Sequence, residues 1–247
     1  MKKTTRLISL LLAAFLLTAS LASCDWGVHP VPEDGFSSSS EPFTPHQFGA
    51  DDAAAMGVRI GMTQEQVKKI LGAPDEERDG TGDGFIYGTC IDYLYKGFSL
   101  SFFDVNEGND LTLGTIVLHS PEVSFAGGLH VGSTKEDVLN AFTYEKEPEP
   151  LYFSTMEESC GDYIYGNINS SWFIEEKPTD EMYCAYINRY GEEYDNSYMM
   201  EYYYYPPLNW NADKSHCSGE YYGAIFYLDS ETDIVTGIRI ELGLSEY

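Results

Sequence analysis

Two stretches of this sequence repeat one another, and this duplication limits the possible fold more than any other feature does. GMTQEQVKKILGAP begins at Gly61, and GSTKEDVLNAF begins at Gly132, 71 positions later. Further along each copy, TCIDYLYKG from Thr89 is matched by SCGDYIYGN from Ser159. Matched blocks that recur in one order at a nearly fixed spacing predict two structural repeats and not a chance likeness.

The first block of each copy has the signals of a short, capped helix. The pairs that can form a capping box are Thr63 with Gln66 in the first copy, and Ser133 with Glu136 or Thr134 with Asp137 in the second. The apolar residues at i, i+3 and i+4 are Val67, Ile70 and Leu71 in the first copy, and Val138, Ala141 and Phe142 in the second. Helices of about ten residues are marginal alone in water, so each is expected to pack on a sheet.

The remaining blocks predict antiparallel strands. The second block is rich in aromatic residues, and it matches Tyr93 with Tyr163 and Tyr95 with Tyr165. A third pair of segments, 101–118 and 225–242, has the pattern strand, polar turn, strand in both copies. We therefore expect an α+β fold, in which each repeat is a short helical layer followed by an antiparallel β-meander. The helices would cover one face of the sheet and leave the other face free.

The second copy carries an insert, residues 167–222, that is unusually rich in tyrosine. Several of its tyrosines recur every four residues, a spacing that fits either a helical stripe or one face of a strand. Gly191 and the turn-like residues 195–197 favour two strands around a loop. In the run Tyr202 to Tyr205, alternate residues would then point to opposite faces.

The N-terminus resembles a bacterial lipoprotein signal. Basic residues precede the apolar run 7–21, and Leu-Ala-Ser-Cys ends at Cys24. This pattern implies cleavage before Cys24 and lipidation of its thiol; the alternative is a plain secretory signal in which Cys24 is incidental. The expected organisation is a signal peptide at 1–23, a lipidated cysteine and disordered tether at 24–52, a first repeat at 53–122 and a second at 123–247.

The charge of the chain excludes one class of ligand. The net charge is −26, and removal of residues 1–23 leaves 11 basic and 40 acidic residues, a net charge of −29. Such a chain repels phosphate backbones, so no nucleic-acid partner is expected, and it reaches the membrane only through the lipid anchor. The charge favours solubility and, in a partner, a basic surface.

The sequence gives no support for catalysis or for a cofactor. The five histidines are dispersed, and the acidic segment from Asp104 departs from an EF-hand because Thr115 stands at its twelfth position. Four cysteines follow the lipidation site, and their spacing leaves the pairing open: Cys90, Cys160, Cys184 and Cys217. We expect no enzyme, no metal and no cofactor.

The stretch GMTQEQVKKILGAP resembles the Gly-Met-Thr…Val…Leu-Gly-x-Pro signature of the small outer-membrane lipoprotein domain, the SmpA/OmlA or BamE-like family. A tandem of two such units resembles the β-lactamase inhibitor protein (BLIP-like) fold. The second copy departs from the signature, because Ser133 replaces methionine and Phe142 replaces leucine. The resemblance covers about 53–247.

The resemblance implies protein binding through an aromatic sheet face by a protein that lies outside the cytoplasm and is lipid-anchored to the cell membrane. The candidate contact residues are Tyr93, Tyr95, Tyr163, Tyr165, Tyr198, Tyr202 and Tyr204. The alternative for any of these tyrosines is that it packs in the core. The alternative function is a structural or assembly factor of a cell-envelope complex, and neither the partner nor the envelope type follows from the sequence.

Overall fold

A computed structural model describes residues 43–80, 89–104, 111–143, 163–166, 182–189, 196–206 and 218–246. The chain divides into two units, 1–33 and 34–247, and all of the described residues belong to the second. The predicted signal peptide, Cys24 and the first part of the predicted tether therefore lie outside the described residues.

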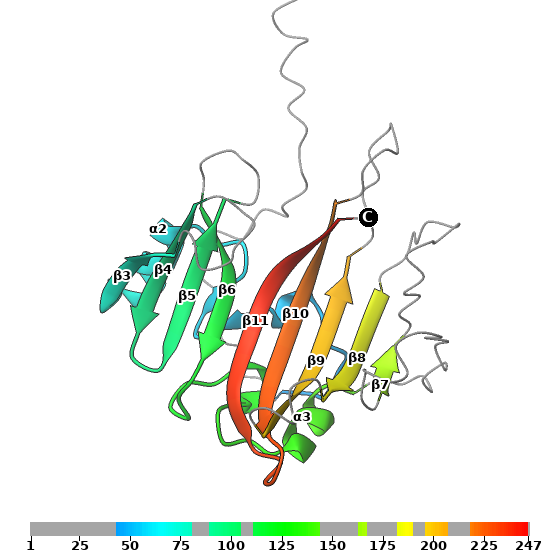
Figure 1. Cartoon of the computed structure of the whole chain (residues 1–247). Coiled ribbons are helices and arrows are strands. Elements are labelled where there is room, and N and C mark those ends of the chain that lie inside the picture. The colour runs from blue at the N-terminus through cyan, green and yellow to red at the C-terminus, as the bar shows by residue number, and fades with distance from the viewer. Residues whose placement is uncertain are drawn as a thin grey trace, which may run out of the picture. The chain divides into compact units, whose positions relative to one another are not determined.

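Nine strands form a single antiparallel sheet in the order β3-β4-β5-β6-β11-β10-β9-β8-β7, and β1 and β2 form a separate pair (Figure 1). The strands that precede the second helix are β1 (Ala54–Ala55), β2 (Val58–Arg59), β3 (Glu76–Asp79), β4 (Cys90–Tyr95), β5 (Phe98–Phe103) and β6 (Thr112–Leu118). Those that follow it are β7 (Tyr163–Gly166), β8 (Met182–Asn188), β9 (Ser197–Tyr205), β10 (Ser218–Asp229) and β11 (Val235–Glu246). The helical elements within the described residues are η1 (Ala50–Asp52), α2 (Gln64–Leu71), η2 (Ala126–Gly128) and α3 (Lys135–Ala141).

The sheet has two halves that meet at β6 and β11. Ile116 pairs with Ile240, and Leu118 pairs with Ile238. Outward from this junction, the next three strands are β5, β4 and β3 on one side and β10, β9 and β8 on the other, so the strand number falls by one at each step on both sides. β7 is added at the edge of the second half. This symmetry is the structural counterpart of the duplicated sequence.

Each helix begins at the same kind of junction with a strand. Two backbone hydrogen bonds join Leu113 to Gly61 and Met62, each 2.7 Å, and two join Val235 to Gly132 and Ser133, each 2.8 Å. The equivalent bonds hold the start of α2 beside β6 and the start of α3 beside β11. The two matched GMT/GST stretches therefore occupy equivalent places in the two halves.

The predicted helix caps are present. Thr63 and Gln66 form the capping box of α2, and Thr134 and Asp137 form that of α3. Of the two caps that the sequence allowed in the second copy, the structure has the one at Thr134. Its Oγ1 accepts a hydrogen bond from the Asp137 N–H at 3.1 Å, while Asp137 Oδ2 accepts one from the Thr134 N–H at 2.8 Å.

The two helices pack on the same face of the sheet, which we call the helix-side face. Phe142, at the end of α3, contacts the rings of Tyr202 and Phe226 at centroid distances of 5.3 and 6.4 Å. At α2, the Lys68 ammonium lies 4.6 Å from the centre of the Tyr93 ring. The core therefore lies between this face and the segments that cover it.

The predicted α+β class with helical layers is wrong, because the fold is mostly β. The two α-helices have 8 and 7 residues, and at 1.5 Å per residue each is only about 10–12 Å long. Nine strands at about 4.8 Å spacing make a sheet close to 40 Å wide, so these helices cannot form layers over it. Irregular segments and 3₁₀ turns supply the rest of the cover. Within α2, Val67 is buried, whereas Ile70 is 37% exposed and lies outside the core.

The sheet order also corrects one of the sequence matches. β4, which holds Tyr93, is the third strand of its half when β6 is counted as the first. β9 is the third strand of the other half, counted from β11. β7, which holds the predicted counterpart Tyr163, has no equivalent among the described strands of the first half. Two strands around a loop in the insert 167–222 are confirmed, because β8 and β9 pair there in antiparallel fashion.

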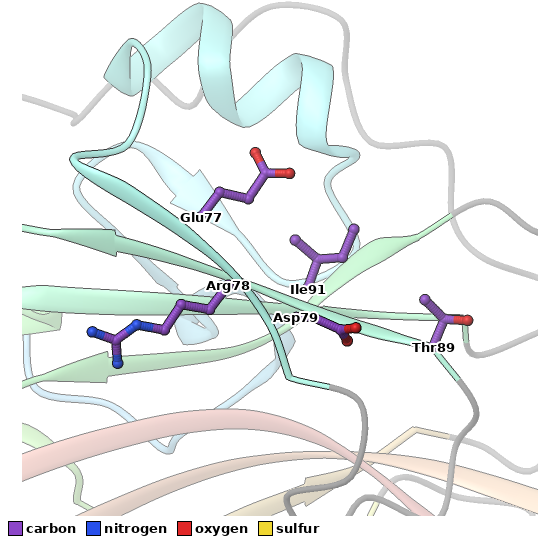
Figure 2. Close-up of a pocket in the computed structure, with 5 residues that line it drawn as sticks. All are labelled: Glu77, Arg78, Asp79, Thr89 and Ile91. Atoms are coloured by element: carbon purple, nitrogen blue, oxygen red, sulfur yellow. The ribbon is translucent and has the colours of Figure 1, made fainter.

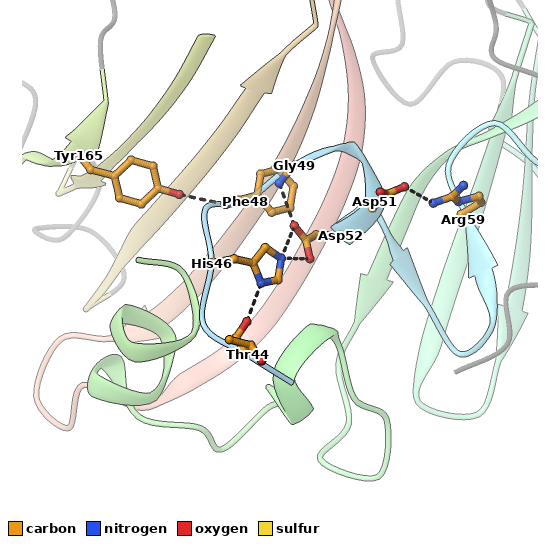
Figure 3. Close-up of polar contacts among 8 residues, drawn as sticks. All are labelled: Thr44, His46, Phe48, Gly49, Asp51, Asp52, Arg59 and Tyr165. Atoms are coloured by element: carbon orange, nitrogen blue, oxygen red, sulfur yellow. Dashed lines mark hydrogen bonds and ion pairs between the residues drawn. The ribbon is translucent and has the colours of Figure 1, made fainter. Parts of the chain in front are cut away.

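Part of the segment predicted as tether belongs to the fold. Phe48 is fully buried, and its ring meets that of Phe142 edge-on at 5.6 Å. Figure 3 shows this segment with the polar contacts around it, including the Arg59–Asp51 ion pair at 3.0 Å. Of the described residues, none belongs to a helix that is long and apolar enough to cross a membrane.

Candidate binding surface

Strand alternation decides which tyrosines of β9 reach the core. Tyr202 pairs with Ala224 and Tyr204 pairs with Tyr222, and both β9 rings are buried on the helix-side face. Tyr203 and Tyr205 point to the opposite face and are half-buried. The predicted alternation along 202–205 is confirmed. However, Tyr202 and Tyr204, which were expected to be accessible, are the two that lie in the core.

The expectation that the seven candidate tyrosines lie on an exposed sheet face is wrong for five of them. The five that are buried are Tyr93, Tyr165, Tyr198, Tyr202 and Tyr204. Tyr95 is half-buried and stacks on Phe98 at 4.8 Å, and its hydroxyl donates to the Gly72 carbonyl. Tyr163 pairs in register with Tyr186. A buried ring offers little contact area to a partner, so the five buried tyrosines belong to the core.

Four other tyrosines form a connected cluster on the face opposite the helices. The members of this tyrosine cluster are Tyr186 of β8, Tyr203 and Tyr205 of β9, and Tyr221 of β10. Their ring centroids are separated by 5.9 Å (186–203), 5.4 Å (203–221), 5.5 Å (205–221) and 6.4 Å (203–205). All four rings are half-buried, so each ring packs on the sheet and still exposes part of its surface to solvent.

Glycines beneath two of these rings hold the cluster close to the backbone. Tyr203 pairs with Gly223, and Tyr221 pairs with Gly243 on β11. A Cβ atom at Gly223 would lie 3.0 Å from the Tyr203 ring, and one at Gly243 would lie 1.9 Å from the Tyr221 ring. The two rings therefore lie over the glycines, where a larger residue would displace them.

A buried carboxylate organises the polar groups of the cluster. Glu201 is 5% exposed and accepts hydrogen bonds from the Tyr203 hydroxyl at 2.5 Å, the Tyr186 hydroxyl at 2.8 Å and Asn188 Nδ2 at 2.9 Å. Burial raises the pKa of both phenols far above the ordinary tyrosine value, and the nearby Glu201 charge raises it further. Both hydroxyls therefore stay protonated and act as donors.

A second carboxylate lies beside the cluster. Glu241 is 9% exposed, and its Oε2 is 2.6 Å from Arg239 Nε. A Cβ at Gly223, between β9 and β11, would lie 3.3 Å from Glu241 Cγ. The centre of this face thus holds two carboxylates, those of Glu201 and Glu241, and one guanidinium.

This face also carries a cysteine, a residue type that can act as a nucleophile. Cys184 lies on the same face but is buried, and burial raises the pKa of its thiol so that the nucleophilic thiolate is disfavoured. Within the described ranges, no group of three or more His, Cys, Asp or Glu side chains could hold a metal ion. Tyrosine rings around buried carboxylates are instead suited to a cationic or amphipathic side chain.

A shallow hollow of about 440 Å³ at the edge of the first half is a weaker candidate. It is lined by residues 77–79 of β3, by Ile91 of β4 and by Thr89, which precedes β4; the β3 residues are Glu77, Arg78 and Asp79. In Figure 2, Glu77 and Ile91 point toward α2, whereas Arg78 points away. The Arg78 guanidinium already binds Glu76 at 2.7 and 3.0 Å, so the described residues of the hollow do not present a convergent set of ligand-binding groups.

The sequence contained a signal for the tyrosines of the cluster, but it lay in the partner strands. Glycine within a strand marks a place where another group comes close. Gly223 and Gly243 are such glycines, and each pairs with a tyrosine of the cluster. Without the strand pairing, the sequence cannot say which tyrosines lie over them.

Comparisons of the chain with family models, curated proteins and solved structures found no match.

Proposed function

We propose that this chain is a membrane-anchored lipoprotein outside the cytoplasm that binds a protein partner through the tyrosine cluster. The observation that carries the proposal is the connected set of half-buried tyrosines around Glu201 on the face opposite α2 and α3. Tyrosine supplies large, rigid contact area at low entropic cost, and its hydroxyl lowers the cost of exposure before binding.

The anchor rests on the sequence. The apolar run 7–21 followed by Leu-Ala-Ser-Cys supports lipidation at Cys24, and the acidic composition supports a role that does not require contact with anionic surfaces. The pseudo-symmetric halves of the sheet support the resemblance to tandem SmpA/OmlA units. We do not assign an enzymatic activity to the chain.

The charge of the surface points to a basic contact residue on the partner. Glu201 is held by three neutral donors, and Glu241 is held by Arg239, so the centre of the face has an excess of negative charge. Aromatic ring faces attract cations, and desolvated pairs of this kind contribute about 2 kcal/mol. An arginine or lysine of the partner would be favoured over an acidic residue by both effects.

Site-specific photocrosslinking in cells tests the proposal. A photoreactive phenylalanine analogue is introduced at Tyr205 or Tyr221 in the cluster, and at Ile70, which is exposed on α2, as the control. We expect one discrete protein adduct from positions 205 and 221 and none from position 70. Failure of both cluster positions to form an adduct, or the same adducts from position 70, would contradict the proposed surface.

A further inference from the structure

The segment that leads into the fold is held along the end of α3. The His46 N–H donates to the Ala141 carbonyl at 3.2 Å, and the Thr143 N–H donates to the His46 carbonyl at 2.9 Å. Two residues later, the buried Phe48 donates its N–H to the Tyr165 hydroxyl at 3.3 Å. Residues 43–49 thus form a strap that connects α3 with β7, and the strap is the first described part of the chain after the predicted anchor.

One histidine and one aspartate link the middle of this strap to η1, the 3₁₀ turn that follows it (Figure 3). His46 Nδ1 is 2.8 Å from the Thr44 carbonyl oxygen, and His46 Nε2 is 2.9 and 3.1 Å from the two carboxylate oxygens of Asp52. The Gly49 N–H donates to Asp52 Oδ2 at 2.8 Å. Asp52 is only 9% exposed, so water cannot replace these contacts freely.

The acceptors around the ring fix where its protons lie. A carbonyl oxygen only accepts, so His46 Nδ1 carries a hydrogen. The Nε2 atom faces a carboxylate, so a second proton must lie between His46 and Asp52, on either the imidazole or the carboxyl group. The pair therefore holds one proton more than a neutral imidazole and a carboxylate do, and it titrates as a unit.

We propose that the His46–Asp52 pair is a proton-operated clasp that holds residues 43–49 on the fold and loosens them when its proton is lost. A neutral imidazole has a single N–H, so without that proton either the Thr44 carbonyl or the Asp52 carboxylate faces a ring lone pair, and one of the two contacts is lost. His46 is also the residue whose backbone pairs with α3, so a shift of its ring acts on both backbone hydrogen bonds. This inference does not depend on the proposed partner or on its surface.

The other groups around the clasp do not provide a competing switch among the described residues. The end of α3 presents Ala141 and Phe142, neither of which titrates, and the ring of Phe43 lies 5.0 Å from that of His46. Asp51, next to the clasp in sequence, is bound to Arg59 at 3.0 Å. Its negative charge adds to that of Asp52 and favours retention of the proton.

The electrostatics set the direction of the pH effect. Burial by itself lowers the pKa of His46, but the Thr44 carbonyl and the Asp52 carboxylate outweigh it, so the pKa is raised above its ordinary value. Burial also raises the pKa of Asp52. The folded pair therefore holds its proton more tightly than the unfolded chain does. Its contribution to stability is fully present below the ordinary histidine pKa of about 6.5 and is lost as the pH rises through the folded value.

Hydrogen exchange of the full-length protein, measured by mass spectrometry at low and high pH and corrected for intrinsic exchange rates, tests the clasp. We expect the protection of peptide 43–49 to fall by about threefold or more between about pH 5.5 and pH 8.5, while β10 and β11 stay protected. His46→Gln keeps a polar side chain that does not titrate, and it should abolish this pH dependence. His119→Gln, at an exposed histidine outside the clasp, is the matched control and should leave it intact.

A direct titration of the His46 ring by NMR keeps the test decisive if the variant does not fold. We expect protons on both ring nitrogens at low pH and a midpoint above that of an exposed histidine. A His46 midpoint below the ordinary value, unchanged protection of 43–49 between the two pH values, or the same pH dependence in His46→Gln would each overturn the proposal.

Discussion

Val67 and Val138 occupy the same position in two separate helices. Each is four residues after a threonine N-cap, Thr63 or Thr134, and each is fully buried. The same backbone hydrogen bonds to β6 and β11 orient the two helix starts. The duplicated sequence thus places one apolar side chain from each copy into the core on the helix-side face.

Truncation of either valine should destabilise the protein by a similar amount. A fully buried valine contributes about 1.5–3 kcal/mol through burial, so we expect Val67→Ala and Val138→Ala each to lower the free energy of unfolding by about 2 kcal/mol. Ile70→Ala on the exposed side of α2 should change it by less than about 0.5 kcal/mol. Urea unfolding followed by fluorescence measures all three. A negligible effect at only one of the two valines would mean that the two helices are not equivalent in the core.

The features that could be predicted from the sequence are local ones. A capping box joins residues three positions apart, and strand alternation needs only neighbours. The cap at Thr63 and the two-sided run 202–205 were therefore predicted correctly, and the cap at Thr134 was one of two predicted alternatives. The face that each tyrosine occupies depends on β8 and β10, which pair with β9 from distant parts of the chain. Local pattern therefore identified two alternating sets of tyrosines, but it could not say which set the helices cover.

The prediction of helical layers was wrong for a related reason. The capping and apolar signals correctly located α2 and α3, but they said nothing about how much of the sheet two such helices could cover. Nor did the matched second block reveal that β7 lies at an edge, because its position depends on the pairing of β8 with β9. Chain topology, and not residue type, decided both points.

The contact between Phe103 and Gly114 predicts a stability difference between two glycines. A Cβ at Gly114 would lie 2.3 Å from the ring of Phe103, which is itself buried, so Gly114→Ala should destabilise the protein by about 1–3 kcal/mol through overpacking. At Gly237 the nearest ring atom, in Tyr227, would be 3.6 Å away, which is ordinary contact. Gly237→Ala should therefore be neutral or stabilising, by up to about 1 kcal/mol. Thermal unfolding of both variants checks the order, and equal losses would contradict the packing argument.

Lipidation at Cys24 makes a prediction that does not depend on the fold. Cells that express the protein are grown with a labelled palmitate analogue, and we expect label in the wild type and none in Cys24→Ser, because the acceptor thiol is lost. Cys184→Ser, which removes a thiol buried in the sheet, is the control and should retain the label. Labelling of Cys24→Ser, or its absence from the wild type, would show that the N-terminus is not a lipoprotein signal.

The adjacent tyrosines Tyr202 and Tyr203 should respond in opposite ways when each loses its hydroxyl. The Tyr202 hydroxyl is buried on the helix-side face and has no hydrogen-bond partner among the described residues. Its removal in Tyr202→Phe deletes an unsatisfied polar group, so we expect the free energy of unfolding to rise by about 1 kcal/mol.

The Tyr203 hydroxyl donates to the buried Glu201 carboxylate at 2.5 Å, and its removal leaves that carboxylate with one donor fewer. Tyr203→Phe should therefore lower the free energy of unfolding by about 2 kcal/mol. Urea unfolding compares the two variants, which differ from the wild type by one oxygen atom each and lie side by side on β9. If Tyr202→Phe is the more destabilised of the two, the hydroxyl in the core has a partner, and the division of this strand between core and tyrosine cluster is wrong.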